Sequence, residues 1–219
     1  MIHLSKRLNS IYNLVPNDVA IDVGADHGQL IISLIENNVV DYGYAVENKK
    51  GPYERMAKAI NASKAKERIT PIFASGIHKM PKDVKTVIIA GMGGQTIVSI
   101  LKDDIEKLDN VETILIDSHG AFSFVREEIV KMGFYIDMEE IILEDHIYYE
   151  IMRFKKGHAS YTEEEYYFGP ILLKQKNETF LQKWNEKLEE INNLLSKDNL
   201  PSSRRDELNK EKERIMKVL

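Results

Sequence analysis

The residues best suited to chemistry follow an apolar run near the start of the chain, in the segment Ala20-Ile21-Asp22-Val23-Gly24-Ala25-Asp26-His27-Gly28. Its first four residues predict a buried strand, Gly24 permits a tight turn, and Gly28 lets a helix begin close to a bound ligand. Glu47 follows about twenty residues later, where a carboxylate can accept hydrogen bonds from the two hydroxyls of a ribose. This spacing predicts a site for a molecule that carries adenosine.

The turn after the first strand indicates which adenosine-bearing molecule fits. The middle glycine of a dinucleotide-binding turn is missing, and Ala25 and Asp26 stand there instead. Asp26 would add negative charge beside a pyrophosphate, whereas the positive sulfonium of S-adenosyl-L-methionine suits an acidic turn. Asp22 and Gly24 can approach the amino-acid or ribose end of such a cofactor. The turn therefore favours S-adenosyl-L-methionine over NAD.

Two more glycine-containing segments are expected at the same edge of the sheet. Ser75-Gly76 ends a third strand, and Ala90-Gly91-Met92-Gly93-Gly94 ends a fourth. Three glycines in one segment remove side chains, so a flat substrate base can come close to the methyl donor, with Met92 as an apolar wall. The predicted cofactor contacts beyond the first turn are Glu47, Asn48, Ser75, Gly76, Ala90 and Gly91.

Asp26 and His27 are predicted to be catalytic, together with Met92, because they open the first helix beside the same cleft. A histidine titrates near neutral pH and can bind substrate or move a proton, although a structural histidine is the alternative. Asp117-Ser118-His119 has the composition of a hydrolase triad, but contiguous residues cannot converge as a triad requires. No metal site is expected, because metal-ligand spacing is missing among His3, His78, His146 and His158.

Composition restricts the class of protein. The chain has 219 residues, 43% of them hydrophobic, and no cysteine, which excludes disulfides and thiolate chemistry. A net charge of −5 argues against a general nucleic-acid binder, although the lysines of the first part leave a local basic face open. The start of the chain does not read as a signal peptide, and the longest uncharged run, 86–101, is too short to span a bilayer. We expect a cytoplasmic protein without a membrane segment.

Strand and helix patterns alternate along the first two thirds of the chain. Strands are predicted at 19–23, 43–47, 69–74, 86–90, 112–116, 135–143 and 148–154. Helices are predicted at 27–37, 52–62, 96–101 and 122–132. This order predicts an α/β fold whose sheet has five parallel strands and an antiparallel pair at one edge, as in class I, Rossmann-like methyltransferases.

The pattern changes after a polar stretch at 155–160, which we interpret as a linker. We therefore predict a cofactor-binding domain at 1–160 and a helical domain at 161–219. Apolar residues then recur at steps of three and four, at Leu181, Trp184, Leu188, Ile191, Leu195, Leu208, Ile215 and Leu219. Pro201 and the serines after it start a second helix, so a helical hairpin is expected. A coiled coil that is structural or dimerising is an alternative to one that clamps substrate.

Several segments together resemble the bacterial TrmK family of tRNA (adenine-N1)-methyltransferases. Asp22 to His27 is similar to the family's Asp-Ile-Gly-Ser-Asp-His, and Glu47 with Gly51-Pro52-Tyr53 matches Glu-x-x-x-Gly-Pro-Tyr. Ala90 to Gly94 is identical to its Ala-Gly-Met-Gly-Gly. The remaining similar segments are Ser5-Lys6-Arg7-Leu8, Phe168-Gly169-Pro170, Lys174 to Asn177 and Phe180 to Trp184. The resemblance covers nearly the whole chain.

The resemblance implies methyl transfer from S-adenosyl-L-methionine to N1 of adenine 22 in tRNA, by a monomer whose C-terminal coiled coil helps to hold the tRNA. N1 lies on the pairing edge, so the base must be exposed, by flipping out of the stack. The chain departs from the family at Gln29, where tyrosine is frequent, at Ile116 to His119, where the family has Leu-Gln-Pro-Asn, and at Ser75, where some members have aspartate. The alternatives are a catalytically silent tRNA-binding protein, a small-molecule methyltransferase and an NAD-binding oxidoreductase.

Overall fold

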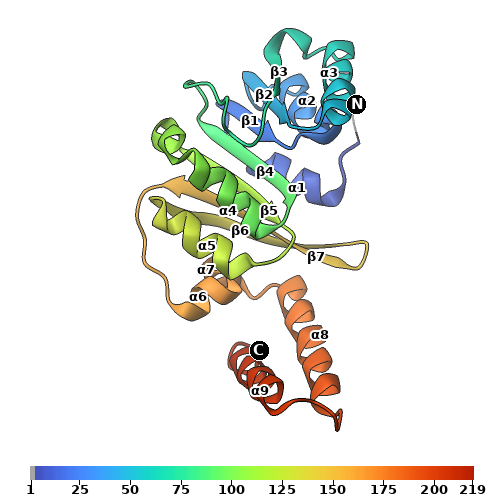
Figure 1. The fold of residues 1–219 in the computed structure, drawn as a ribbon, viewed down its shortest axis with the longest axis vertical. Coiled ribbons are helices and arrows are strands. Elements are labelled where there is room, and N and C mark those ends of the chain that lie inside the picture. The colour runs from blue at the N-terminus through green and yellow to red at the C-terminus, as the bar shows by residue number, and fades with distance from the viewer. Residues whose placement is uncertain (1–2) are drawn as a thin grey trace. The chain divides into compact units, whose positions relative to one another are not determined.

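A computed structural model describes residues 3–219 of the chain. A seven-stranded sheet lies at its centre, with the strand order β3-β2-β1-β4-β5-β7-β6 (Figure 1). The strands are β1 (Val19–Val23), β2 (Tyr42–Glu47), β3 (Ile69–Phe73), β4 (Thr86–Met92), β5 (Thr113–Ser118), β6 (Phe134–Glu144) and β7 (Ile147–Lys156).

The pairing of the strands confirms the predicted class I methyltransferase arrangement. β1 pairs in parallel with β2 and β4, β2 with β3, and β4 with β5. β7 is antiparallel to both β5 and β6, so the last two strands form the antiparallel edge. They are joined through Asp145 and His146, whose positive φ angles of 49° and 63° suit a tight turn between antiparallel strands.

Helices cover both faces of the sheet. α1 (Lys6–Leu14), α2 (Gln29–Glu36) and α3 (Lys50–Ala62) contribute to one apolar core that includes Ala20, Ala45, Ile88 and Leu115 from the strands. α4 (Gly94–Asp103), α5 (Phe122–Lys131) and α6 (Glu163–Phe168) form the other layer, in which α5 contacts both α4 and α6. Figure 1 shows α4 and α5 lying over β4 and β5. Three short 3-10 turns complete this unit, at Asp26–Gly28, Lys66–Arg68 and Ile105–Asn110.

The structure places the end of the sheet unit later than the sequence pattern does. The predicted linker at 155–160 is wrong for its first two residues, because Lys155 and Lys156 belong to β7 and pair with β6. Helix α6 follows and packs against α5, so the division by contacts falls after Pro170, ten residues beyond the expected boundary at 160. The second compact unit is Ile171–Leu219.

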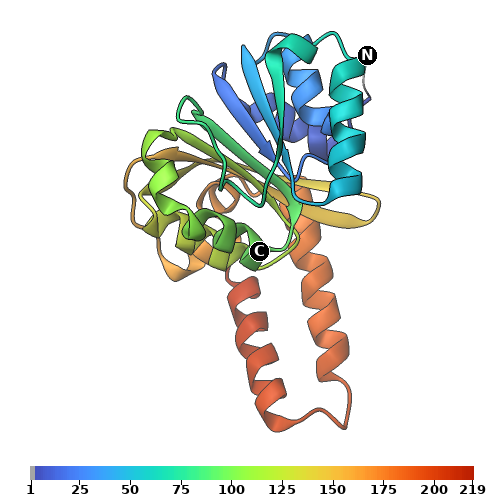
Figure 2. The same ribbon diagram turned by 45° about the horizontal axis from the view of Figure 1, so that its top comes forward.

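The second unit is the predicted helical hairpin. α7 (Pro170–Gln175) leads into α8 (Glu178–Leu195), which packs against α9 (Ser202–Met216), and Figure 2 shows the two longer helices running side by side. Trp184 and Ile191 are buried as expected, but Leu181, Leu188 and Leu195 are half-buried. Leu219 does not continue the stripe, because it lies beyond α9 and is 41% exposed. The coiled coil stays a prediction.

None of the helices within residues 3–219 is both long enough and apolar enough to cross a membrane.

Candidate active site

Two adjoining cavities open at the carboxyl ends of the parallel strands. The first has a volume of about 370 Å³ and the second about 360 Å³. Four residues line both of them, namely Gly24, Asp26, Ala90 and Gly91. All four lie at or just after the ends of β1 and β4, where neighbouring parallel strands leave room above the sheet. The shared wall makes the two cavities one continuous candidate site.

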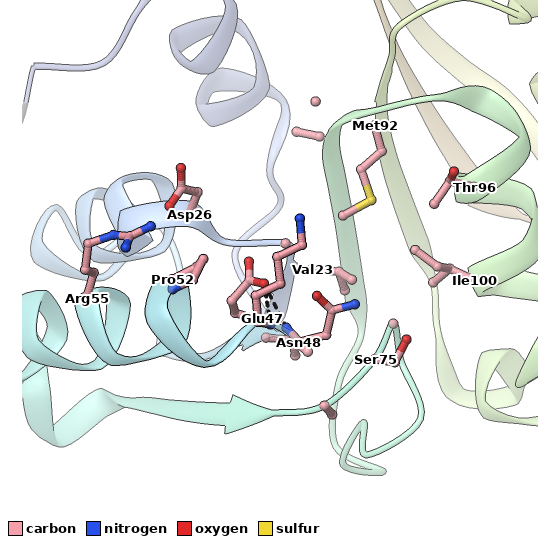
Figure 3. Close-up of a pocket in the computed structure, with 17 residues that line it drawn as sticks. Val23, Asp26, Glu47, Asn48, Pro52, Arg55, Ser75, Met92, Thr96 and Ile100 are labelled. Carbon is pink, nitrogen blue, oxygen red and sulfur yellow. Dashed lines mark hydrogen bonds between the residues drawn. The ribbon is translucent and has the colours of Figure 1, made fainter.

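The first cavity contains the acid predicted to bind ribose. Oε1 of Glu47 accepts hydrogen bonds from the backbone N–H groups of Asn48 and Lys49, both at 2.9 Å (Figure 3). These bonds fix the carboxylate at the end of β2, and within residues 3–219 they leave Oε2 without a hydrogen bond. Ser75 and Gly76 line the same cavity after β3, as predicted. A carboxylate held in this way can accept hydrogen bonds from a diol.

Met92 bounds the first cavity from the side of β4. Figure 3 shows its thioether extending into the cavity toward Val23. A Cβ atom at Gly24 would lie 2.3 Å from the terminal methyl of Met92, so that methyl rests directly on the bare backbone of the turn. The side chain gives this cavity an apolar side, and its role as a wall against the substrate base stays a prediction. It lines only the first of the two cavities.

The turn after β1 is fixed to the end of β2. The N–H groups of Gly24 and Ala25 both donate to the carbonyl of Val46, at 2.8 and 3.1 Å. Gly24 has a φ of +76°, a conformation that a residue with a side chain rarely adopts. This confirms the role that the sequence gives to the glycine in the turn.

The sequence pattern predicts that His27 opens the helix, and this is wrong. His27 has a φ of +59° and lies with Asp26 in a 3-10 turn, and α2 begins only at Gln29. Such a conformation costs roughly 1–3 kcal/mol in a residue other than glycine and tends to occur at functional sites. The Nε2 atom of His27 lies 3.6 Å from Oδ1 of Asp26, and both side chains are more than half exposed. The strained turn therefore presents an acid and an imidazole to solvent at the cavities.

Asp22 faces the second cavity from within the sheet. Its side chain is almost fully buried, and it accepts no hydrogen bond from any residue in the described part of the chain. Burial raises the pKa of its carboxyl group from 3.8 to about 7. A buried carboxylate without a partner is costly, so this position is suited to a ligand that brings a positive charge.

Arg7 brings a positive charge to the same cavity. Its Nη1 donates to Oδ2 of Asp117, which is fully buried at the end of β5. The guanidinium carbon lies 5.3 Å from the centroid of the Tyr149 ring, a cation–π distance. Nη1 is also 3.4 Å from the place that a Cβ atom of Gly91 would take. The guanidinium is therefore held over the glycine turn, with further N–H donors available to a ligand.

Helix α1, which carries Arg7, is itself anchored at its start. The Oγ of Ser5 accepts a hydrogen bond from the N–H of Leu8, and the carboxylate of Glu144 accepts from the N–H groups of Lys6 and Arg7, at 2.7 and 3.2 Å. Glu144 comes from the end of β6, so the β6–β7 hairpin fixes the beginning of α1. The sequence pattern does not predict α1. In the sequence, Arg7 stands out through the similarity of the segment Ser5-Lys6-Arg7-Leu8 to the family's opening and as one of the basic residues of the first part.

His119 lines the second cavity from the loop after β5. Asp117 pairs with Arg7, and the Oγ of Ser118 donates to the carbonyl of Gly120 at 2.6 Å, so these three consecutive residues form no triad. That agrees with the rejection of a hydrolase from sequence. Sequence reasoning nevertheless missed His119 as a cavity residue, because no pattern shows which side chains of separate loops converge.

Every predicted site residue lines at least one of the two cavities, and their roles remain predictions. Asp22 and His27 line the second cavity. The first cavity is lined by Glu47, Asn48, Ser75, Gly76 and Met92, and the shared wall by Gly24, Asp26, Ala90 and Gly91. No group of three or more histidine, aspartate or glutamate residues that could hold a metal ion occurs within residues 3–219.

Comparisons with known proteins agree with this geometry. A curated relative from Bacillus subtilis (strain 168), a tRNA (adenine(22)-N(1))-methyltransferase, is 28% identical over 201 residues, which cover 88% of this chain and 84% of that protein. A Streptococcus pneumoniae protein, solved in complex with S-adenosyl-L-methionine, is 30% identical with a TM-score of 0.92, and the match covers 99% of this chain and 100% of that one.

A third similar protein is TrmK of M. capricolum. Its structure in complex with S-adenosyl-homocysteine is 26% identical, with a TM-score of 0.88, and the match covers 98% of this chain and 96% of that one. The family model for TrmK, tRNA (adenine(22)-N(1))-methyltransferase, matches residues 20–219. The match includes the strand ends that form both cavities, together with the helical hairpin, and the chain belongs to the TrmK family of tRNA (adenine(22)-N(1))-methyltransferases.

Proposed function

We propose that this protein binds S-adenosyl-L-methionine across the two cavities and transfers its methyl group to N1 of adenine 22 in tRNA. The observation that carries the proposal is the shared wall of Gly24, Asp26, Ala90 and Gly91, which joins a cavity suited to a nucleoside to one suited to a charged group. The complexes of the two related proteins with S-adenosyl-L-methionine and S-adenosyl-homocysteine support the choice of cofactor.

The first cavity would hold the adenosine part of the cofactor. Oε2 of Glu47 is the acceptor for the ribose hydroxyls, because Oε1 is already used by the backbone of Asn48 and Lys49. Ser75 and Gly76 border the adenine, and a bare position at Gly76 fits because Ile100 already lies 3.0 Å from where a Cβ would be. These residues bind the adenosine part of the cofactor and orient it.

The second cavity would hold the amino-acid part, which is a zwitterion. The buried carboxylate of Asp22 has no partner within residues 3–219 and would pair with the ammonium group. The guanidinium of Arg7, anchored by Asp117, would donate to the carboxylate. Opposite charges on the two sides of one cavity match a zwitterion better than they match a pyrophosphate, which would face the carboxylates of Asp22 and Asp26.

When bound, the cofactor supplies a methyl group on a sulfonium, so that adenine N1 forms the new N–C bond with its lone pair while the C–S bond breaks and its electrons remain on sulfur. The residues mainly position the two reactants. Asp26 stabilises the positive charge that the base then carries, and Nε2 of His27 accepts a proton from N6. The side chain of Met92 forms the apolar side of the first cavity. The base reaches this point by flipping out of the tRNA.

The remaining parts of the chain fit a tRNA partner. The helical unit from Ile171 exposes basic side chains that can contact phosphates, at Lys174, Lys176, Arg204 and Lys210. It would help to hold the tRNA, while the unit that ends at Pro170 carries out the methyl transfer. The protein would act as a monomer in the cytoplasm, where it meets tRNA.

Labelled methyl transfer to unmodified tRNA tests the function. We expect incorporation into wild-type tRNA and none when adenine 22 is replaced by another base, and label that persists after this replacement would refute the site of methylation. The roles of the acidic turn are tested by Asp26→Asn and His27→Ala. Both should lower kcat while S-adenosyl-homocysteine still binds, and full turnover in both variants would show that neither residue is catalytic.

A further inference from the structure

The wall of the second cavity at the end of β5 is aromatic. His119 lines this cavity, and its ring lies edge-to-face with that of Tyr149, with the centroids 6.2 Å apart and an interplanar angle of 62°. Arg7 packs on the Tyr149 ring, so that this ring is held in turn. We propose that His119, supported by Tyr149, stacks on the target adenine when the base enters the second cavity beside the amino-acid part of the cofactor. The inference rests on the methyl transfer to tRNA proposed above.

The backbone holds His119 in a fixed place beside the glycine turn. Its N–H donates to the carbonyl of Met92 at 2.8 Å, which joins the loop after β5 to the end of β4. A Cβ atom at Gly94 would lie 2.8 Å from the carbonyl oxygen of Gly120, so the two loops are packed against each other through bare glycines. The ring therefore stands on a rigid rim, as a stacking surface requires.

The backbone beside His119 is bare on the side of the shared wall, and Arg7 is the other side chain that borders this space. Gly91 has a φ of +75°, and the nearest atoms to its missing Cβ are Nη1 of Arg7 at 3.4 Å and Nε2 of His119 at 4.0 Å. Nothing lies within 4 Å of the corresponding position at Gly93. The imidazole and the bare backbone of Gly91 thus face the same space, and a flat purine fits such a space where a residue with a side chain would block it.

Stacking on a side chain stabilises a base that has left the tRNA stack. A base that leaves the tRNA stack loses its neighbours, and aromatic side chains such as histidine replace them in proteins that bind flipped or single-stranded bases. Stacking also leaves N1 free to attack, whereas a hydrogen bond to N1 would use the lone pair.

Methylation kinetics with tRNA and calorimetry with S-adenosyl-homocysteine test the inference. His119→Ala should lower kcat/KM for tRNA by about 10- to 100-fold, the usual range for one stacked base, with the affinity for S-adenosyl-homocysteine within about twofold of wild type. His119→Phe keeps an aromatic ring and should stay within about threefold of wild type. His158→Ala is the matched control and should have no effect, because this exposed histidine follows β7 near the start of β5, whereas His119 follows the end of β5.

Two results would overturn the stacking role while leaving the proposed function intact. One is wild-type kcat/KM in His119→Ala, and the other is a loss in His119→Phe as large as that in His119→Ala. If S-adenosyl-homocysteine affinity falls as much as kcat/KM, His119 contacts the cofactor and the inference is wrong. If the wild-type protein transfers no methyl group to tRNA, the proposed function fails, and the inference fails with it.

Discussion

The two cavities are built in different ways. The first depends mainly on backbone placed at the ends of β1 to β4, with glycines at 24, 76 and 91 and an acid at 47. The second is made by side chains from distant parts of the chain, since Arg7 and its partner Asp117 are 110 residues apart. A site of the first kind can be found from local spacing, whereas a site of the second kind exists only once the chain has folded.

The electrostatics of the cavities also differ. In the first, Glu47 is half-buried and fixed by two backbone N–H groups. In the second, Asp22 is buried without a partner inside residues 3–219, and Arg7 is held by a buried carboxylate. Binding in the second cavity should therefore depend more strongly on pH and on single charges. This contrast can be tested one side chain at a time.

The largest effect is expected from closing the wall that the cavities share. Gly24→Val places a branched side chain where the Met92 methyl already lies 2.3 Å from a Cβ position, and the φ of +76° adds strain. Both cavities should be obstructed. We expect a loss of at least about 100-fold in affinity for S-adenosyl-homocysteine, measured by calorimetry.

Gly93→Ala is the matched control for this variant. Gly93 has an ordinary φ of −67°, and no atom lies within 4 Å of its Cβ position, so affinity should remain within about twofold. Thermal unfolding identifies a Gly24→Val protein that has simply lost its fold. A folded Gly24→Val variant with wild-type affinity would show that Gly24 does not border the ligand site.

The next effect separates the two cavities with two ligands. Arg7→Ala should weaken S-adenosyl-homocysteine binding by about 10- to 100-fold, because the hydrogen bonds to its carboxylate are charge-assisted. 5′-Methylthioadenosine has no amino-acid part, so its affinity should change by less than about threefold. Calorimetry with both ligands measures the difference.

Glu47→Gln should weaken both ligands equally, unlike Arg7→Ala. The ribose is common to both ligands, so their affinities should fall together, by about tenfold. If Arg7→Ala weakens both ligands equally, Arg7 acts on the whole site through Asp117 and α1, and the division of the ligand between the cavities is wrong.

A smaller effect, about fivefold, is expected from pH. The pKa of Asp22 is about 7 in the folded protein, and only its charged form attracts an ammonium group. The affinity for S-adenosyl-homocysteine should therefore fall by about fivefold when the pH drops from 7 to 6, whereas 5′-methylthioadenosine should respond weakly. In Asp22→Asn the affinity should be low, and this part of its pH dependence should vanish.

The same group makes the stability of the ligand-free protein depend on pH. Between about pH 4 and 7, folded Asp22 holds a proton that the unfolded chain releases, since its ordinary pKa is 3.8. The free energy of unfolding should then decrease as the pH rises through this window. Asp22→Asn should unfold at a higher temperature than wild type at pH 8. An equal or lower Tm at pH 8 would contradict a buried charge without a partner.

The contrast between the cavities explains what could be predicted from the sequence. The alternation of strands and helices predicts the parallel sheet with its antiparallel edge, and the glycines and acids at strand ends predict residues of the first cavity, because both follow from short segments. The start of α2 was misplaced, because the positive φ of His27 is set by the turn rather than by apolar periodicity. Arg7 and His119 could not be placed together, since only tertiary packing brings α1 beside the loop after β5.

The smallest expected effect tests whether the adenine lies beside residue 75 in the first cavity. Ser75 lines it after β3, at the position where some family members have aspartate. Ser75→Asp should raise the affinity for S-adenosyl-homocysteine and for 5′-methylthioadenosine alike, by about threefold, because a carboxylate is a better acceptor for the N6 amino group than a hydroxyl. Ser75→Ala is the control and should lower both by a similar factor. If only one ligand responds, the adenine does not lie beside residue 75, and Glu47 alone would define the nucleoside end of the site.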